Sequence, residues 1–150
     1  HSLEEDCKNK LNNFTYVNKD NEGIIKTLNR ALKLAQGNYI YIIASDDIAA
    51  NDALSTLHHF LSSHKDYGLA VGKNLLIDDK GKRCYWNKEK EIVYSKDEAI
   101  YLSHDECLQK NKPDVDFSND SFGDYAQILM GNHIPNGYLI RKSIMDTIGG

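Results

Sequence analysis

Two adjacent carboxylates, Asp46 and Asp47, are the residues of this sequence best suited to chemistry. They follow Ser45 at the end of an apolar, β-rich run over residues 39–44, and the end of such a strand is where α/β folds hold their ligands. Neighbouring carboxylates repel each other, and a divalent cation converts that repulsion into oxygen ligation. One interpretation of the pattern is a metal-assisted phosphate or diphosphate site. The alternative is a solvated Asp-Asp turn that caps the following helix.

The elements that must position the acid pair are a strand, a helix and a second strand that precede it. Residues 14–17 predict a short strand, and residues 39–44 predict a buried one. Between them, residues 18–23 are rich in turn formers, and an apolar stripe predicts a helix that ends at Gly37. This order of elements implies a parallel pair of strands in one sheet. The stripe consists of Ile24, Leu28, Ala31, Leu32 and Ala35.

Further helices and strands are predicted on both sides of these elements from apolar periodicity and turn residues. The predicted helices cover residues 3–12, 51–61, 97–109, 122–130 and 143–148. The predicted strands cover residues 68–77, 83–86 and 138–140, with a hairpin turn over residues 78–81. Asn51 is expected to cap its helix, and Ser143 and Asp146 have the spacing of a capping box.

Composition indicates one globular domain and excludes several classes of function. The chain has 150 residues, of which 41% are apolar and 27% are charged, and its net charge is -4 with both signs interspersed. Nucleic-acid binding is not expected, because it depends on clustered Lys and Arg. The cysteines, three in number and far apart, indicate reduced thiols in a cytoplasmic protein, and no apolar run is long enough for a transmembrane segment.

The residues around the acid pair resemble the inverting family 2 glycosyltransferases, which have the GT-A fold. The resemblance runs without insertion from Asn21 and Gly23 through Asn29 and the Gly-x-Tyr-Ile strand to Asp47. A second, shorter resemblance joins residues 136–142 to the Ile-Gly-Gly sequence at residues 148–150. The implied fold is an α/β, GT-A-like (Rossmann-like) sandwich with a mostly parallel sheet flanked by helices. The chain is expected to be a central part of a single such domain, incomplete at both ends.

This resemblance implies the substrates, the metal and the donor-binding residues. The donor would be a nucleotide-diphosphate sugar, with a UDP-sugar favoured, and the acceptor a hydroxyl of a glycan or a lipid-linked molecule. A Mg or Mn ion would bridge the diphosphate, with Asp47 as its direct ligand and Asp46 bound to the ribose or to the ion through water. The location implied is the cytoplasm, at the inner face of the membrane. The donor-binding residues would be Gly23, Asn29, Arg30, Ser45, Asp46 and Asp47.

The catalytic base and the acceptor region are placed less directly. The family pattern puts the base beyond residue 150, and Asp120 and Asp124 are the acids within this chain that are candidates for it. Residues 88–119 are expected to form a variable, acceptor-facing region. Ala44 stands where many family members have an acid. Trp86 and Tyr85 would stack on a sugar or, more simply, cover the edge of a sheet.

Two other classes of protein are compatible with these features. A nucleotidyltransferase would also use acids at a strand end together with a metal, but it should carry a basic, glycine-rich phosphate loop near its start, and none is seen. A noncatalytic α/β binding or scaffold module would use the acids only to cap a helix.

Overall fold

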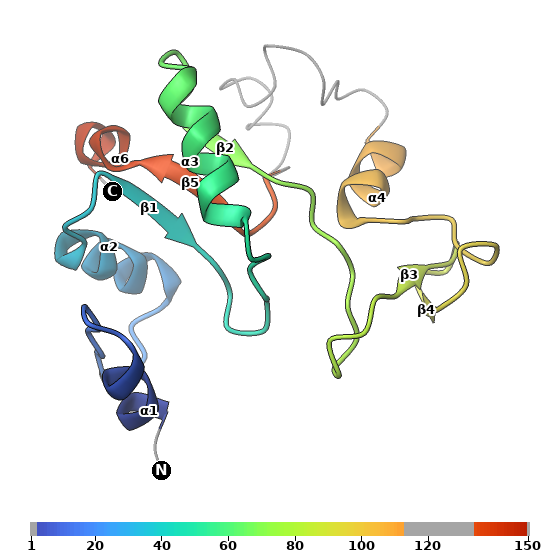
Figure 1. Cartoon of the computed structure of the whole chain (residues 1–150), viewed down its shortest axis with the longest axis horizontal. Helices are drawn as coiled ribbons and strands as arrows, with labels where there is room; N and C mark the ends of the chain where they lie inside the picture. The colour runs from blue at the N-terminus through green and yellow to red at the C-terminus, as the bar shows by residue number, and fades with distance from the viewer. Residues whose placement is uncertain (1–2, 113–133, 150) are drawn as a thin grey trace. The chain divides into compact units, whose positions relative to one another are not determined.

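The computed structural model describes residues 3–112 and 134–149, which belong to two compact units (Figure 1). The first unit covers His1–Ala35 and the second covers Gln36–Gly150. No helix in the described ranges combines the length and the apolar character needed to cross a bilayer.

The first unit contains two helices, as predicted. Helix α1 (Leu3–Lys10) has acids in its first turn and lysines in its last, an arrangement that complements the helix dipole. Helix α2 (Ile24–Leu34) begins after Gly23, whose φ of 84° is disfavoured for residues with a side chain. None of the side chains of α2 is buried, and Ile24 and Ile25 are 73% and 72% exposed.

The predicted strand over residues 14–17 is wrong. These residues have irregular backbone, and all of them except Phe14 are exposed. A strand requires a neighbour to receive its backbone hydrogen bonds, and every strand pairing in the described residues lies within the second unit. The βαβ unit predicted from residues 14–44 is therefore absent.

The second unit is built on a sheet of three strands, β1 (Tyr39–Ile42), β2 (Leu69–Val71) and β5 (Tyr138–Arg141). The strand order is β1-β5-β2, and both pairings are antiparallel. The prediction of a mostly parallel sheet is thus wrong for the described strands. The sheet is antiparallel because β5, which follows β1 and β2 in the sequence, lies between these two strands and runs opposite to both.

In this arrangement β1 and β2 nevertheless end on the same side of the sheet. Because each of these strands is antiparallel to β5, they run in the same direction. Ile42 at the end of β1 and Val71 at the end of β2 both pair with Tyr138, the first residue of β5. We call this side of the sheet, where β1 and β2 end and β5 begins, the carboxyl edge.

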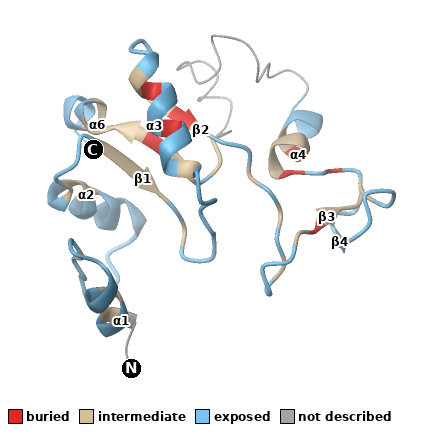
Figure 2. Cartoon of the chain, in the orientation of Figure 1, coloured by how far each residue is buried: buried red, intermediate tan, exposed pale blue. Residues whose placement is uncertain are grey.

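The core lies between this sheet and helix α3 (Ala53–Ser63). Leu57 and Leu61 of the helix pack with Ala70 of β2 and Leu139 of β5, which are the red residues on these elements in Figure 2. The predicted apolar face of this helix is confirmed for both leucines, although the helix begins at Ala53 with Asp52 as its N-cap, rather than after an Asn51 cap. Burial of these aliphatic side chains is the main force that holds α3 on the sheet.

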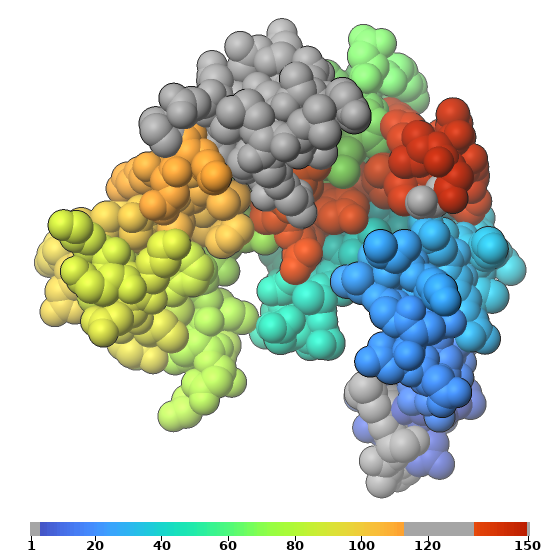
Figure 3. Space-filling model, turned by 180° about the vertical axis from the view of Figure 1, so that it is seen from behind, coloured from blue at the N-terminus to red at the C-terminus, as the bar shows by residue number. Residues whose placement is uncertain are grey.

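Residues 73–112, which we call the connecting segment, contain the hairpin strands β3 (Tyr85–Trp86) and β4 (Ile92–Val93) and the helix α4 (His104–Asn111). The predicted turn at residues 78–81 is confirmed by the Gly81 N–H bond to the Asp78 carbonyl (2.9 Å), and Ile77 bridges Arg83 beyond it. The hairpin and α4 adjoin in the space-filling view (Figure 3). Their small core consists of Cys84, Tyr101, Ser103 and Cys107.

Two predicted helix starts are corrected. The helix predicted at residue 97 begins at His104, because Ser103 caps it by accepting a hydrogen bond from the Glu106 N–H (3.2 Å). Helix α6 (Lys142–Ile148) begins directly after β5, so Ser143 is not its cap, and Asp146 pairs with Lys142 (2.7 Å). The helix ends at Gly149, as predicted. The helix predicted over residues 122–130 lies outside the described residues.

Candidate functional site

The acid pair lies on a short turn that follows β1. Asp47 donates its backbone N–H to the carbonyl of Ala44 (3.2 Å), which closes the turn. Ser45, Asp46 and Asp47 are all exposed. Within the described ranges, neither carboxylate makes a hydrogen bond or an ion pair. Both acids are therefore open to a ligand from solvent.

The donor chemistry of this turn fits a Mg or Mn ion. No group of three or more His, Cys, Asp or Glu side chains in the described ranges is arranged to hold a metal ion by itself. However, Mg²⁺ bound to a nucleotide typically takes only one or two carboxylates from the protein, and phosphate oxygens and water complete its shell. Asp46 and Asp47 supply that number of hard oxygen ligands. The turn is suited to a metal that arrives with a phosphate-bearing substrate.

The lead-in to β5 lies directly beside the end of β1. The N–H of Gly137 donates to the carbonyl of Ile42 (3.0 Å), which joins residue 137 to the strand that leads into the acid turn. Gly137 has a φ of 76°, and a Cβ added there would lie 3.3 Å from the Tyr41 hydroxyl. The positive φ therefore favours glycine at this position, and a side chain there would also require the Tyr41 hydroxyl to shift slightly.

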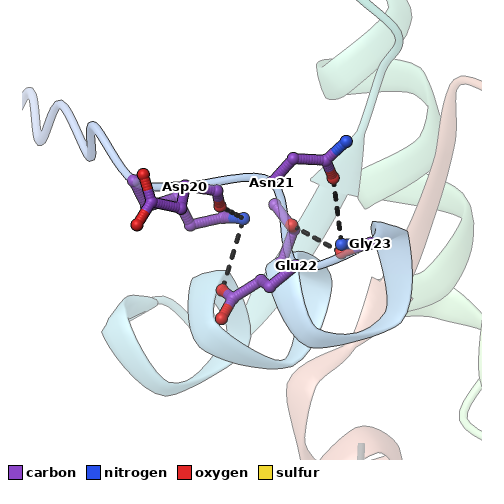
Figure 4. Close-up of polar contacts among 6 residues, drawn as sticks. Asp20, Asn21, Glu22 and Gly23 are labelled. Carbon is purple, nitrogen blue, oxygen red and sulfur yellow. Dashed lines mark hydrogen bonds and ion pairs between the residues drawn. The ribbon is translucent and has the colours of Figure 1, made fainter.

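The other predicted donor residues belong to the first unit. Gly23 is the N-cap of α2, and its N–H donates to the Oδ1 of Asn21 (3.1 Å), as Figure 4 shows. On α2 itself, Asn29 is half-buried and Arg30 is exposed. In the same loop, Lys19 forms an ion pair with Glu22 (3.3 Å). Thus Gly23, Asn29 and Arg30 share one unit, whereas Ser45, Asp46 and Asp47 share the other.

The basic pair at the end of β5 has a structural role. The guanidinium of Arg141 donates to the hydroxyl of Tyr39 (3.0 Å), to the carbonyl of Tyr67 (3.0 Å) and to two carbonyls at the end of α3, those of Leu61 and His64. Arg141 pairs with Tyr39, the first residue of β1, so it lies at the edge of the sheet opposite to the carboxyl edge. A hydrogen bond with Ser62, together with the charge of Arg141, lowers the pKa of Tyr39.

The aromatic pair in the connecting segment also has protein neighbours. Trp86 lies edge-on to the ring of His104, with 6.3 Å between ring centroids, and Tyr85 lies under the guanidinium of Arg83 at 5.0 Å. Both aromatic side chains are half-buried. Such contacts are those of residues that cover the edge of the β3–β4 hairpin.

Asn74 is a residue of the carboxyl edge that the sequence analysis did not single out. Its side-chain amide donates to the carbonyl of Asn136 (3.0 Å), next to Gly137, and its backbone bonds to the start of α4. A single polar residue shortly after a strand carries no sequence signal of such contacts. Asp120 and Asp124, the candidates for the catalytic base, lie outside the described residues.

The family model for glycosyl transferase family 2 matches residues 2–122, which is most of the chain. The chain therefore belongs to glycosyl transferase family 2, and it is a glycosyltransferase sequence with the α/β fold of the GT-A class. Members of this family use a nucleotide-sugar donor and an acceptor, and they commonly require a divalent metal. Neither the curated proteins nor the solved structures gave a significant match.

Proposed function

We propose that this domain transfers a sugar, with inversion, from a nucleotide-diphosphate donor to a hydroxyl of a glycan or lipid-linked acceptor. The observation that carries the proposal is that the family match includes a turn with two exposed carboxylates, directly after β1 and without partners in the described part of the chain. A UDP-sugar is the favoured donor. The proposed location is the cytoplasmic face of a membrane.

In this proposal the acid turn binds the donor diphosphate. Asp47 holds the Mg or Mn ion, and Asp46 binds the ribose or a water molecule on the ion. The ion, when bound, neutralises the charge that develops on the diphosphate leaving group. Ser45 offers a hydroxyl to the same ligand. Family membership and sequence spacing also support Gly23, Asn29 and Arg30 as donor contacts.

The acceptor is proposed to bind to residues 88–119, a range that begins within the connecting segment. An inverting transfer requires a base that removes the proton of the acceptor hydroxyl while its oxygen attacks the anomeric carbon. Asp120 and Asp124 are the candidates for this base within the chain, and an acid after Gly150 is the alternative.

The experiment that tests this proposal is a calorimetric titration of UDP in the presence and absence of Mn²⁺. We expect binding that requires Mn²⁺ and is lost in Asp47→Ala. Asp79→Ala is the matched control, because Asp79 is also an exposed acid in an Asp-Asp turn. UDP binding that survives Asp47→Ala unchanged would refute the role of Asp47 as a metal ligand. An equal loss of binding in Asp79→Ala would show that both substitutions act only through the net charge of the chain.

A noncatalytic binding module would behave differently in the same experiment. If the acid pair only terminates β1 and precedes α3, Mn²⁺ should not alter UDP affinity in the wild-type chain or in a chain extended at both ends. That result in the extended chain would favour the noncatalytic reading.

A further inference from the structure

Asn74 makes contacts with two segments that are distant from it in the sequence. Its backbone N–H donates to the Oδ2 of Asp105 (3.0 Å), and its carbonyl accepts from the N–H of His104 (3.1 Å). Its side-chain amide donates to the carbonyl of Asn136 (3.0 Å). Asn74 thus bonds to the first turn of α4 through its backbone and to the lead-in of β5 through its side chain.

The start of α4, which Asn74 contacts, is held by hydrogen bonds of its own. The hydroxyl of Ser103 accepts from the N–H of Glu106 (3.2 Å), and the carboxylate of Glu106 accepts from the N–H of Leu102 (2.8 Å). The arrangement differs from a capping box only in that Glu106 accepts from the residue before the Ser103 cap and not from Ser103 itself. Asp105 is not needed to cap the helix, and its carboxylate is used for the N–H of Asn74. Fixing Asn74 therefore fixes the start of α4.

The other contact of Asn74 leads to the acid turn. Asn136 precedes Gly137, whose N–H bonds to the carbonyl of Ile42 at the end of β1. Hydrogen bonds, together with the peptide bond between Asn136 and Gly137, therefore connect α4 through Asn74 and the β5 lead-in to Ile42, the last residue of β1, which precedes the acid turn. Each link joins residues of the second unit.

We propose that Asn74 is a positioning residue that ties the start of α4, and with it the acceptor-facing part of the connecting segment, to the lead-in of β5 at the carboxyl edge. The expected effect of Asn74 on the use of an acceptor rests on the proposed function. The side-chain amide of Asn74 fixes the acceptor side relative to the donor turn, and it takes no part in binding the donor. Loss of this amide should weaken the use of an acceptor and leave the binding of the nucleotide unchanged.

The test compares Asn74→Ala and Asn74→Asp with the wild-type chain. The alanine removes only the bond to Asn136, because both backbone bonds remain. The aspartate places a carboxylate oxygen against the Asn136 carbonyl, where two acceptors repel, so its effect should be larger. The control is Asn87→Ala, which removes two side-chain bonds with Glu91, one to its carboxylate (3.1 Å) and one from its backbone N–H (2.9 Å), within the same segment but away from the three-stranded sheet.

The first measurement is backbone hydrogen exchange. We expect exchange over residues 104–111 and 134–138 to become roughly five- to tenfold faster in Asn74→Ala, and faster again in Asn74→Asp, with α3 unchanged. The control Asn87→Ala should leave both ranges unchanged. Unaltered exchange at the start of α4 in both Asn74 variants would overturn the proposal.

The second measurement separates positioning from general destabilisation. On the active enzyme, octyl glucoside, octyl galactoside and octyl N-acetylglucosaminide serve as hydroxyl probes, and water is the competing acceptor. We expect the acceptor KM to rise roughly fivefold in Asn74→Ala, with donor hydrolysis and Mn²⁺-dependent UDP affinity unchanged. Reduced UDP affinity in the variants would overturn the assignment to the acceptor side. If the wild-type chain binds no UDP, the proposed function fails, while hydrogen exchange still decides the structural coupling.

Discussion

The sequence contains two Asp-Asp turns, and the structure uses them in different ways. At residues 78 and 79, the Oδ1 of Asp78 accepts from the N–H groups of Lys80 (3.0 Å) and Lys82 (2.8 Å), and its Oδ2 accepts from the hydroxyl of Tyr94 (2.8 Å). At residues 46 and 47, the carboxylates have no partner among the described residues. The turn at residues 78 and 79 uses the carboxylate of Asp78 to hold the hairpin, whereas the turn at residues 46 and 47 leaves both carboxylates available.

This difference shows what a pair of acids can and cannot reveal in a sequence. Both pairs come after an apolar run, directly after Ile77 in one case and after Ser45 at the end of residues 39–44 in the other. The Asp78 turn is followed by Gly81, whose φ of 76° allows the chain to fold back onto the carboxylate. No glycine follows Asp47 closely, and the chain continues to α3. A carboxylate that its own backbone does not satisfy is the better candidate for binding a ligand.

The largest effect expected from this contrast is on ligand-linked stability. At UDP and Mn²⁺ concentrations about 100-fold above Kd, binding adds about 2.7 kcal/mol to the free energy of unfolding, which raises Tm by roughly 5–10 °C for a chain of this size. Asp47→Asn should abolish this rise, because the amide is a neutral and weaker metal ligand. Asp78→Asn should retain the full rise from a lower starting Tm. Thermal unfolding followed by circular dichroism measures both.

A smaller effect is expected on the pH dependence of stability. The backbone N–H of Lys82, with the Tyr94 hydroxyl, lowers the pKa of Asp78 below its ordinary value. Asp78 therefore stabilises the fold above its unfolded pKa of about 3.9, and this contribution is lost as the pH falls through the lower pKa of the folded state. Asp78→Asn should be less stable than the wild type at pH 6, and the difference should shrink towards pH 2.5.

Urea unfolding at several pH values measures the free energies of unfolding of Asp78→Asn and of the wild type. Asp46→Asn is the control, since Asp46 has no partner among the described residues and its substitution should leave the free energy of unfolding nearly unchanged at each pH. An equal loss of stability in Asp46→Asn would show that the carboxylate of Asp46 stabilises the fold as much as that of Asp78 does.

The smallest effect is expected from Ala44→Asp. This substitution adds a third carboxylate at the position where many family members carry an acid. A higher ligand charge strengthens the binding of a divalent cation, so Mn²⁺ alone should bind roughly three- to tenfold more tightly. Mn²⁺ titration followed by electron paramagnetic resonance measures this directly. Weaker binding in the variant would show that residue 44 does not face the ion held by Asp47.

Local signals in the sequence predicted the helices well, but not what each helix packs against. The apolar spacing is more regular in α2 than in α3, although both helices have 11 residues. Leu57 and Leu61 of α3 are buried against the sheet, whereas α2 buries no side chain. Periodicity records which face of a helix is apolar, and the identity of its partner depends on tertiary contacts that the pattern does not contain.

The sheet was predicted less well, because strand pairing is a long-range property. The strands predicted over residues 39–44 and 138–140 are confirmed as Tyr39–Ile42 and Tyr138–Arg141, but nothing local indicates that β5 lies between β1 and β2. The short run at residues 14–17 has β propensity without a partner, and propensity alone does not make a strand. The exposed acid turn was predicted from its residue types, while Asn74 was missed because its partners are 31 and 62 positions away.

The position of β5 also determines the order in which the sheet can assemble. Tyr39 and Arg141 are register partners separated by 102 positions, so closing the sheet requires a long loop to be ordered. During synthesis, β1 and β2 leave the ribosome with no strand between them, and both ladders form only after β5 has emerged. Until β5 has emerged, the backbone of β1, just before the acid turn, has no ladder partner among the described strands, and such an unpaired strand is open to chaperones or other strands.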